Sequence, residues 1–312
     1  MASNQPSVFI DGEAGTTGLG IRTRLEMLPG IELRSLPAAQ RKDPSARQDM
    51  MAACDLVVLC LPDDAAREAV GLAAALGADT PKLLDASTAH RVHPEWTYGF
   101  PEMAPDQPRQ IAVSGKVTNP GCYPTGAIAL LRPLVETGLV PADYPITISA
   151  VSGYSGGGRS AIEAHDRDGG PAFELYALGL QHKHVPEIER FAGLSRRPIF
   201  MPSVGHFRQG MLVSVPLYLD DLPGKPAGTD LREALRAFYE GSEHVVVVAG
   251  NGHDKLEPEA LNGSNRLELY VWANEARRHA VLVARLDNLG KGASGAAVQN
   301  LRLMLDVGPG SN

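Results

Sequence analysis

The chain has 312 residues, enough for two domains of ordinary size, and 44% of them are hydrophobic against 21% that are charged. The net charge of −7 argues against nucleic acid or an anionic membrane surface as the main partner. No apolar run approaches the ~20 residues of a membrane span, and the opening MASNQPSVFID lacks the pattern of a secretion signal. Three scattered cysteines are too few for a disulfide framework, so we expect a cytoplasmic protein.

The first predicted elements are a buried strand, a glycine-rich turn and a helix. Residues 7–11 form the strand, GEAGTTGLG follows, and IRTRLEML has helical period. In this setting glycines let the backbone approach a pyrophosphate, and the helix N-terminus favours its charge. The predicted dinucleotide contacts are Gly12, Gly15, Thr16, Thr17 and Gly18. Because the spacing G-x-x-G-x-x-G is not the commoner G-x-G-x-x-G, an ordinary tight turn is the alternative; no Gly-Lys-Ser/Thr follows, which excludes a Walker loop.

Basic and hydroxyl residues end the second predicted strand, residues 31–36. NAD-binding domains place an acidic side chain there to bind the ribose 2′-OH. This strand ends instead in Arg34 and Ser35, with Arg41 and Lys42 close behind. Such groups suit a 2′-phosphate, so the sequence favours NADP over NAD; solvated surface residues are the alternative.

Strands and helices continue to alternate through residue 85. A helix is predicted around 45–53, a strand at 55–61, a helix at 63–76 and a short strand at 82–85. This order predicts an α/β fold with a parallel, doubly wound sheet, whose ligands bind at the carboxyl ends of the strands. Arg91, in DASTAHR, would lie at such an end and can bind a phosphate or carboxylate through two hydrogen bonds, unless it is a surface arginine.

The segment VTNPGCYPTGAIALL places Cys122 at the start of a helix, directly after a turn signal. There the unpaired N–H groups and the positive end of the helix dipole favour a thiolate and can hold an oxyanion. A cysteine so placed can attack a carbonyl and stabilise the tetrahedral adduct. A buried structural cysteine is the alternative.

The pattern changes after Cys122. A strand is predicted at 145–151, the glycine-rich SGYSGGGR follows it, and residues 172–193 contain helical pieces. Long alternating strands then occupy residues 210–219, 243–249, 267–274 and 279–287, with the helix LREALRAFYEG among them. This succession predicts a mixed or antiparallel sheet in a second domain. The tail GASGAAVQNLRLML has helical spacing and is expected to pack back on the first domain.

The segment HKHVPE offers His182 and His184 as acid/base partners for Cys122, with His206 as second choice. In an extended chain the two would point to the same side; two surface or hydrogen-bonded histidines are the alternative. No CxxC or HExxH spacing supports a metal ion, so no metal site is predicted.

These motifs resemble a known family. Through GEAGTTGLG, DASTAHR, VTNPGCYPTGAIALL, SGYSGGGR, HKHVPE and DNLGKGASGAAVQN, the chain resembles the shorter N-acetyl-gamma-glutamyl-phosphate reductases over essentially its whole length. That family lies within the semialdehyde dehydrogenase group. The resemblance implies an NADP-binding Rossmann domain of residues 1–121 and 288–312, and an inserted α+β catalytic and oligomerisation domain of residues 122–287. It also implies a homo-oligomer and a place in arginine biosynthesis.

The resemblance also implies roles for single residues. Cys122 would be the nucleophile and His184 or His182 the acid/base, with His184 preferred. Arg91 would receive the phosphate of the substrate, with Asn119 nearby. Besides the glycine-loop residues, the implied coenzyme contacts are Arg34, Ser35, Ser87, Ser155, Gly156 and Asn288.

The implied reaction is the NADPH-dependent reductive dephosphorylation of N-acetyl-L-glutamyl 5-phosphate to N-acetyl-L-glutamate 5-semialdehyde, through a thioester on Cys122. An aspartate-semialdehyde dehydrogenase would apply the same cysteine chemistry to a shorter substrate. Two alternatives come from other classes: a catalytically silent NADP-binding sensor, which predicts an unreactive Cys122, and a zinc hydrolase, which predicts stoichiometric zinc.

Overall fold

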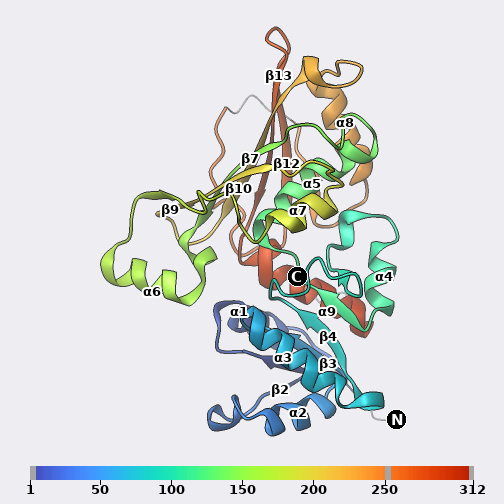
Figure 1. The fold of residues 1–312 in the computed structure, drawn as a ribbon, viewed down its shortest axis with the longest axis vertical. Coiled ribbons are helices and arrows are strands. Elements are labelled where there is room, and N and C mark those ends of the chain that lie inside the picture. The colour runs from blue at the N-terminus through green and yellow to red at the C-terminus, as the bar shows by residue number, and fades with distance from the viewer. Residues whose placement is uncertain (1–4, 250–253, 309–312) are drawn as a thin grey trace. The chain divides into compact units, whose positions relative to one another are not determined.

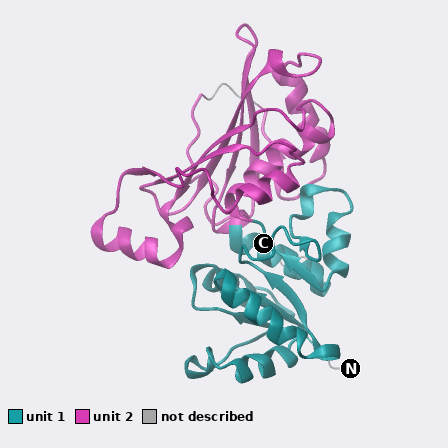
Figure 2. Ribbon diagram, viewed as in Figure 1, with its two compact units in different colours: residues 1–120, 293–312 teal, residues 121–292 magenta. Residues whose placement is uncertain are grey.

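The computed structural model describes residues 5–249 and 254–308. The chain packs as two compact units, of residues 1–120 with 293–312 (unit 1) and of residues 121–292 (unit 2) (Figure 2). Gly121 and residues 288–292 therefore pack with unit 2, whereas the domains expected from the sequence place them with the coenzyme-binding part. The reason is local: Asn288 accepts a hydrogen bond from the amide of Gly210, and the backbone of Gly292 lies against Cys122.

Unit 1 is built on a parallel sheet of six strands, as the alternation predicts (Figure 1). The order is β2-β1-β3-β4-β6-β5, and the neighbouring strands pair in parallel. The strands are β1 (Ser7–Asp11), β2 (Glu32–Arg34), β3 (Leu56–Leu59), β4 (Lys82–Asp85), β5 (Thr97–Tyr98) and β6 (Lys116–Thr118). The second strand is shorter than predicted, and β5 and β6 were not predicted.

Helices cover both faces of this sheet, because successive residues of its strands point to opposite faces and are apolar on both. The helices are α1 (Thr16–Glu26), α2 (Pro44–Ala52), α3 (Asp63–Ala74), α4 (Gln107–Val113) and α9 (Gly295–Leu305). Val8 and Val58 form one core with residues of α1 and α9, and Phe9 and Val57 form the other with residues of α2 and α3. The predicted return of the C-terminal helix to the first domain is confirmed, since Leu301 belongs to the first core.

Two glycines shape the β1–α1 turn by allowing close backbone contact. Gly12 has φ +91°, and a Cβ there would lie 2.3 Å from the carbonyl oxygen of Cys60. A Cβ on Gly18 would lie 2.6 Å from the carbonyl oxygen of Gly12. Any larger side chain would push the loop away from β3 or from its own helix. The first and last glycines of the predicted fingerprint thus have the roles that the motif requires.

Unit 2 contains the predicted mixed sheet, with seven strands in the order β11-β12-β13-β10-β7-β9-β8. The pairs β7–β9 and β11–β12 are parallel, and the others are antiparallel. The strands are β7 (Thr147–Gly153), β8 (Phe173–Leu175), β9 (Ile199–Gly205), β10 (Met211–Tyr218), β11 (Val245–Val247), β12 (Leu267–Asn274) and β13 (His279–Leu286). The predicted strand at 243–249 is reduced to β11, and β9 was missed.

The helices of unit 2 are α5 (Cys122–Glu136), α6 (Gly158–Asp168), α7 (Val185–Phe191) and α8 (Gly228–Phe238). Helix α5 lies against one face of the sheet, where a Cβ on Gly126 would come within 2.9 Å of Val213 and 3.2 Å of Ala284. Helix α6 was not predicted; its sequence is mostly polar, and none of its residues is fully buried. Residues 172–193 contain β8 as well as α7 rather than helical pieces alone. In the described part of the chain, no helix has the length and apolar character to cross a membrane.

Candidate active site

Cys122 is the first residue of α5, as the turn signal predicts. Gly121 is the N-cap, in extended conformation, and its carbonyl oxygen accepts the amide of Thr125 at 3.0 Å. Pro124 has no backbone N–H, so it adds no donor to the first turn of α5. The donors nearest the sulfur in this turn are the backbone amides of Cys122 and Tyr123. Cys122 is half-buried and is not in a disulfide. This position can serve a nucleophile whose adduct carries a negative oxygen.

A buried carboxylate connects the cysteine segment to the histidine segment. Glu187, in the first turn of α7, accepts a hydrogen bond from the amide of Gly121 at 2.8 Å. Only 1% of Glu187 is exposed. The contact fixes the residue before Cys122 relative to α7, whose N-cap is His184. No role was predicted for Glu187 from the sequence, and its part in holding the turn was missed.

The two histidines of HKHVPE lie ring to ring, with centroids 4.6 Å apart. His182 accepts the backbone amide of His184 with Nδ1 at 3.1 Å, and its Nε2 lies 3.4 Å from the hydroxyl of Tyr176. In the neutral ring the proton therefore sits on Nε2. Both nitrogens of His182 thus have partners within the protein. His184 is buried beside it, with its ring 5.9 Å from that of Tyr123.

Tyrosines complete the surroundings of the sulfur. Burial raises the pKa of Tyr176 to about 12, the charge of Cys122 adds to the shift, and a hydrogen bond with Tyr123 acts against it. Burial also raises the pKa of Tyr123, whose hydroxyl donates to the carbonyl of Ser203 at 2.9 Å. Both phenols keep their protons at neutral pH. Tyr176 was missed in the sequence because it follows a short exposed strand without any motif of its own.

Metal ligands do not gather in unit 2 around these residues. Across the described residues, no group of three or more His, Cys, Asp and Glu side chains is arranged to hold a metal ion.

The predicted dinucleotide loop lies in unit 1, between β1 and α1. Gly15 caps α1, its amide donates to Gly12 at 3.1 Å, and Thr16 and Thr17 begin the helix. No acidic residue occupies the first turn, so the helix presents unopposed N–H dipoles there. Gly12 and Gly18 let the loop pack tightly against Cys60 and against itself, which holds the loop at the start of α1. The loop therefore fits a pyrophosphate.

The two residues predicted at the ribose phosphate face different partners. Arg34 donates to the carboxylate of Glu32 and to the carbonyl of Ala53. Ser35 instead donates to Glu13 at 2.8 Å and accepts from Arg22 at 2.7 Å. Ser35 thus belongs to a polar cluster beside the glycine loop, and Arg34 does not.

The DASTAHR segment folds over the buried carboxylate at the end of β4. Asp85 accepts the amide and hydroxyl of Ser87 at 2.8 and 2.9 Å, and its Oδ2 lies 2.6 Å from Nδ1 of His90. The ring of His90 stacks on that of Trp96 at 4.4 Å. Arg91 is buried and donates to the carbonyl of Ala86 at 3.3 Å. The segment is therefore a fixed loop at the carboxyl end of a strand rather than surface chain.

The other predicted contacts divide between the units. In unit 1 the side chain of Asn119 donates to Ala293 at 3.0 Å and accepts from Asn300 at 3.1 Å. In unit 2 Asn288 donates to the hydroxyl of Ser155 at 3.0 Å, and Gly156 lies beside them. The structure thus brings Ser155, Gly156 and Asn288 together, although they come from distant parts of the chain.

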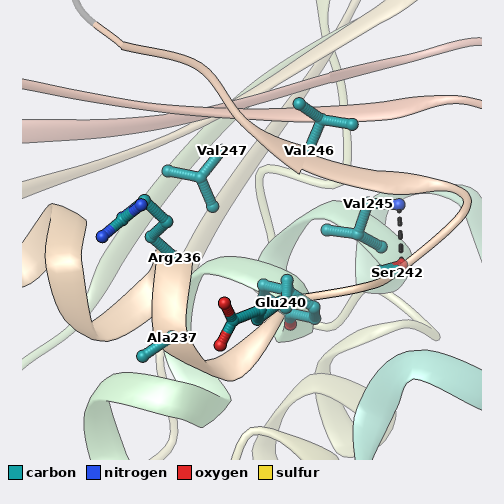
Figure 3. Close-up of a pocket in the computed structure, with 8 residues that line it drawn as sticks. Arg236, Ala237, Glu240, Ser242, Val245, Val246 and Val247 are labelled. Carbon is teal, nitrogen blue, oxygen red and sulfur yellow. Dashed lines mark hydrogen bonds between the residues drawn. The ribbon is translucent and has the colours of Figure 1, made fainter.

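A cavity of about 330 Å³ in unit 2 lies elsewhere, between the end of α8 and β11 (Figure 3). Its lining includes Arg236, Glu240, Ser242 and the three valines of β11. It contains none of the residues predicted for catalysis, so we assign it no part in the reaction.

Comparison with known proteins gives consistent matches over the whole chain. Residues 12–111 match the semialdehyde dehydrogenase NAD binding domain, and residues 122–288 match the semialdehyde dehydrogenase dimerisation domain. N-acetyl-gamma-glutamyl-phosphate reductase 2 of Pseudomonas putida is 54% identical over 306 residues, covering 96% of this chain and 97% of its own. The N-acetyl-gamma-glutamyl-phosphate reductase of Burkholderia cenocepacia is 52% identical over 309 residues, with the same coverage.

Solved structures of the same fold are more distant in sequence. Aspartate semialdehyde dehydrogenase II from Vibrio cholerae has a TM-score of 0.72 at 14% identity, covering 97% of this chain and 99% of its own. Aspartate semialdehyde dehydrogenase from Francisella tularensis has a TM-score of 0.73 at 14% identity, covering 96% and 99%. At this identity the likeness concerns the fold.

Proposed function

This chain belongs to the N-acetyl-gamma-glutamyl-phosphate reductases of the semialdehyde dehydrogenase family, and we propose that Cys122 carries out their reaction through a thioester. The substrate is N-acetyl-L-glutamyl 5-phosphate and the product N-acetyl-L-glutamate 5-semialdehyde, a step of arginine biosynthesis. The observation that carries the proposal is Cys122 at the start of α5, fixed to the histidine segment through Glu187 and Gly121.

In the first half of the reaction the sulfur of Cys122 attacks the acyl-phosphate carbonyl. A tetrahedral adduct forms, and its oxygen is stabilised by the backbone amides of Cys122 and Tyr123. The amide of Gly121 is excluded from this role because it donates to Glu187. The adduct collapses with loss of inorganic phosphate, for which Arg91 is our candidate binding residue, and an acyl-enzyme remains.

In the second half the thioester carbon accepts a hydride, which the nicotinamide of NADPH supplies when bound. The resulting adduct expels the sulfur and releases the aldehyde. His184 is our candidate to take the proton of the thiol and to return protons later. We assign His182 to positioning, because its two nitrogens are held by the backbone of His184 and by Tyr176.

The coenzyme site that we propose combines the β1–α1 loop with the groups that follow β2. Gly12, Gly15, Thr16, Thr17 and Gly18 would hold the pyrophosphate at the start of α1, where the helix dipole favours negative charge. Ser35 remains a candidate for the ribose phosphate, and Ser87, Ser155, Gly156 and Asn288 remain candidates on the nicotinamide side.

The reverse reaction tests this function directly. With N-acetyl-L-glutamate 5-semialdehyde, NADP and inorganic phosphate, we expect absorbance of NADPH to appear at a rate that depends on phosphate. Aspartate semialdehyde, one methylene shorter and without the acetyl group, should give a kcat/KM at least about 10²-fold lower. A preference for aspartate semialdehyde would favour the alternative dehydrogenase. No turnover with either, together with an unreactive Cys122, would favour a sensor.

We further propose that the protein is a homodimer joined through the sheet of unit 2, in keeping with the match to a dimerisation domain. Strand β10 alternates between residues buried toward α5, such as Val213, and residues on the opposite face, such as Leu212 and Tyr218. Tyr218 is 61% exposed, and on β9 Ile199 and Met201 are 51% and 39% exposed. This open face is partly apolar, which suits a second copy of the chain.

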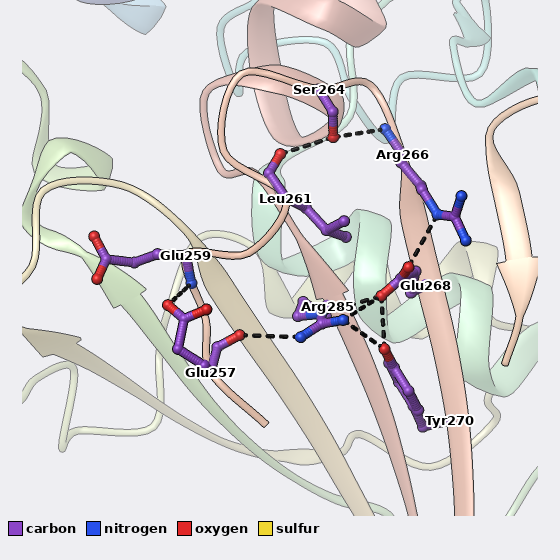
Figure 4. Close-up of polar contacts among 8 residues, drawn as sticks. All are labelled: Glu257, Glu259, Leu261, Ser264, Arg266, Glu268, Tyr270 and Arg285. Carbon is purple, nitrogen blue, oxygen red and sulfur yellow. Dashed lines mark hydrogen bonds and ion pairs between the residues drawn. The ribbon is translucent and has the colours of Figure 1, made fainter. Parts of the chain in front are cut away.

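Polar groups on the same face are already paired within the chain. Glu268 accepts hydrogen bonds from Arg285 and from the hydroxyl of Tyr270, both at 2.6 Å, and pairs with Arg266 at 3.0 Å (Figure 4). Strand register places Arg285 opposite Leu212, on the open face. A partner can therefore cover this network without leaving an isolated charge.

Charges introduced on this face should dissociate the dimer. Replacing Ile199 and Met201 together by lysine is expected to weaken association by about 10²-fold or more, because a twofold interface repeats every substitution. Sedimentation velocity measures the mass. The control is Val113→Lys, since Val113 is 76% exposed on unit 1. An unchanged dimer in the double variant, or a monomeric wild type, would refute this interface.

A further inference from the structure

The carboxylate of Glu13 lies inside the glycine-rich loop and binds two arginines and one serine hydroxyl from three separate segments. Its Oε2 accepts a hydrogen bond from Arg22 of α1 at 2.7 Å and one from the hydroxyl of Ser35 at 2.8 Å. Its Oε1 pairs with Arg41 at 2.6 Å. An acidic residue in a loop that fits a pyrophosphate is unexpected, because it adds negative charge where the ligand already carries some.

In the cluster of Glu13, Arg22, Ser35 and Arg41, the carboxylate is buried and the two guanidinium groups are partly exposed. Glu13 is 8% exposed, whereas the side chains of Arg22 and Arg41 are 35% and 43% exposed. The guanidinium groups therefore reach solvent, and the carboxylate that holds them does not. Arg22 also pairs with the exposed carboxylate of Glu26 at 2.9 Å, so Glu13 is the buried one of two carboxylates beside the two arginines. Each guanidinium has donors beyond those that Glu13 uses.

The hydroxyl of Ser35 connects the groups. It accepts from Nη1 of Arg22 at 2.7 Å while it donates to Glu13. Ser35 comes directly after β2, where dinucleotide-binding domains recognise the 2′ position of the adenine ribose. One hydroxyl and two guanidinium groups gathered around a carboxylate have the composition of a phosphate site already filled by an internal anion.

We propose that Glu13 is a specificity-determining residue that occupies the place of the coenzyme's 2′-phosphate. Without coenzyme it holds Arg22, Arg41 and Ser35 together and neutralises part of their charge. A 2′-phosphate takes over these donors in competition with the carboxylate, whereas a ribose 2′-OH has no charge with which to do so. This inference rests on the proposed use of NADP.

Binding of small nucleotides tests the proposal apart from catalysis. We expect Glu13→Gln to bind adenosine 2′,5′-bisphosphate about tenfold more tightly than the wild type, because the competing charge is gone, and to bind ADP unchanged. Arg41→Gln should weaken the bisphosphate about tenfold and leave ADP unchanged. Titration calorimetry gives both affinities at one fixed ionic strength, because salt screens such contacts.

The matched control is Glu26→Gln. Glu26 also pairs with Arg22, at 2.9 Å, but its side chain is 54% exposed and it contacts neither Ser35 nor Arg41 in the interactions described here. The affinity of this variant for either nucleotide should stay within about twofold of the wild type, since exposed pairs contribute little. If Glu13→Gln does not fold, Arg41→Gln, at a half-exposed position, still decides the question.

Several results would overturn the proposal. Weaker binding of the bisphosphate to Glu13→Gln, or an equal change for bisphosphate and ADP, would make Glu13 a structural residue or a ribose ligand instead. An unchanged affinity of Arg41→Gln for the bisphosphate would show that Arg41 does not bind the 2′-phosphate, which would overturn the proposed phosphate site. A wild type that binds neither nucleotide would overturn the use of NADP as well, whereas binding without reductase turnover would overturn only the proposed function.

Discussion

Replacing Cys122 by serine is expected to lower kcat by at least about 10³-fold, because the hydroxyl is a far weaker nucleophile near neutral pH and its ester is a poorer hydride acceptor than a thioester. The substitution removes one sulfur at the start of α5 and leaves the β1–α1 loop untouched. Binding of NADPH, measured by fluorescence titration, should therefore change by less than about twofold. The two measurements together separate loss of chemistry from loss of fold.

Reactivity of the sulfur gives an independent reading of the same prediction. Iodoacetamide at pH 7 should label Cys122 alone, since burial raises the pKa of Cys54 to about 11 and also raises the pKa of Cys60. The matched control is Cys54→Ser, which should keep its turnover and its labelling. Near-normal activity in Cys122→Ser would rule out the covalent route, as would an intact protein mass that never shows an acyl adduct during turnover.

His184→Asn is expected to lower kcat/KM by about 10²–10⁴-fold, the usual contribution of a general acid or base. Asparagine keeps a polar side chain at the N-cap of α7, where it is a favourable residue, so the fold should survive. The variant should also slow alkylation of Cys122 at pH 7. Above about pH 9 the difference should narrow, since an ordinary thiol with a pKa near 8.5 ionises without help.

His182→Asn is the matched comparison. Its ring accepts the amide of His184 and approaches Tyr176, so its loss should disturb positioning and lower kcat/KM by about tenfold. Alkylation of Cys122 should keep its pH dependence. If His182→Asn caused the larger loss, or abolished the pH dependence of alkylation while His184→Asn kept it, the two roles would have to be exchanged.

Much of this architecture follows from local sequence patterns. A short apolar strand, a glycine turn and a run of helical period predict the β1–α1 unit. Gly12 is required in the turn because its φ is +91° and a Cβ there would lie 2.3 Å from the carbonyl oxygen of Cys60. The position of Cys122 at the start of α5 could be predicted because the turn signal Asn119-Pro120-Gly121 directly precedes it. Helix α6 was missed because it follows directly on a glycine-rich loop and its mostly polar sequence contains no fully buried residue.

The surroundings of the sulfur were harder to predict because they come from distant segments without periodicity. Glu187 meets the amide of Gly121 across 66 positions of sequence, and Ser155 meets Asn288 across 133. Similarly, the carboxylate of Glu13 selects Arg22 and Arg41 rather than Arg34, a choice that depends on which way each side chain leaves its element. Sequence spacing alone does not contain that information.

The hydrogen bond between Glu187 and the amide of Gly121 has a consequence for how this site can diversify. It joins the segment of Cys122 to the segment of His182 and His184. We therefore expect the spacing between the sulfur and the two imidazoles to be kept when the surrounding loops change. The residues that contact the acyl chain can then change in length or polarity between relatives, while the distances for proton transfer stay constant. Selection for a new acyl group should accordingly alter residues outside this assembly first.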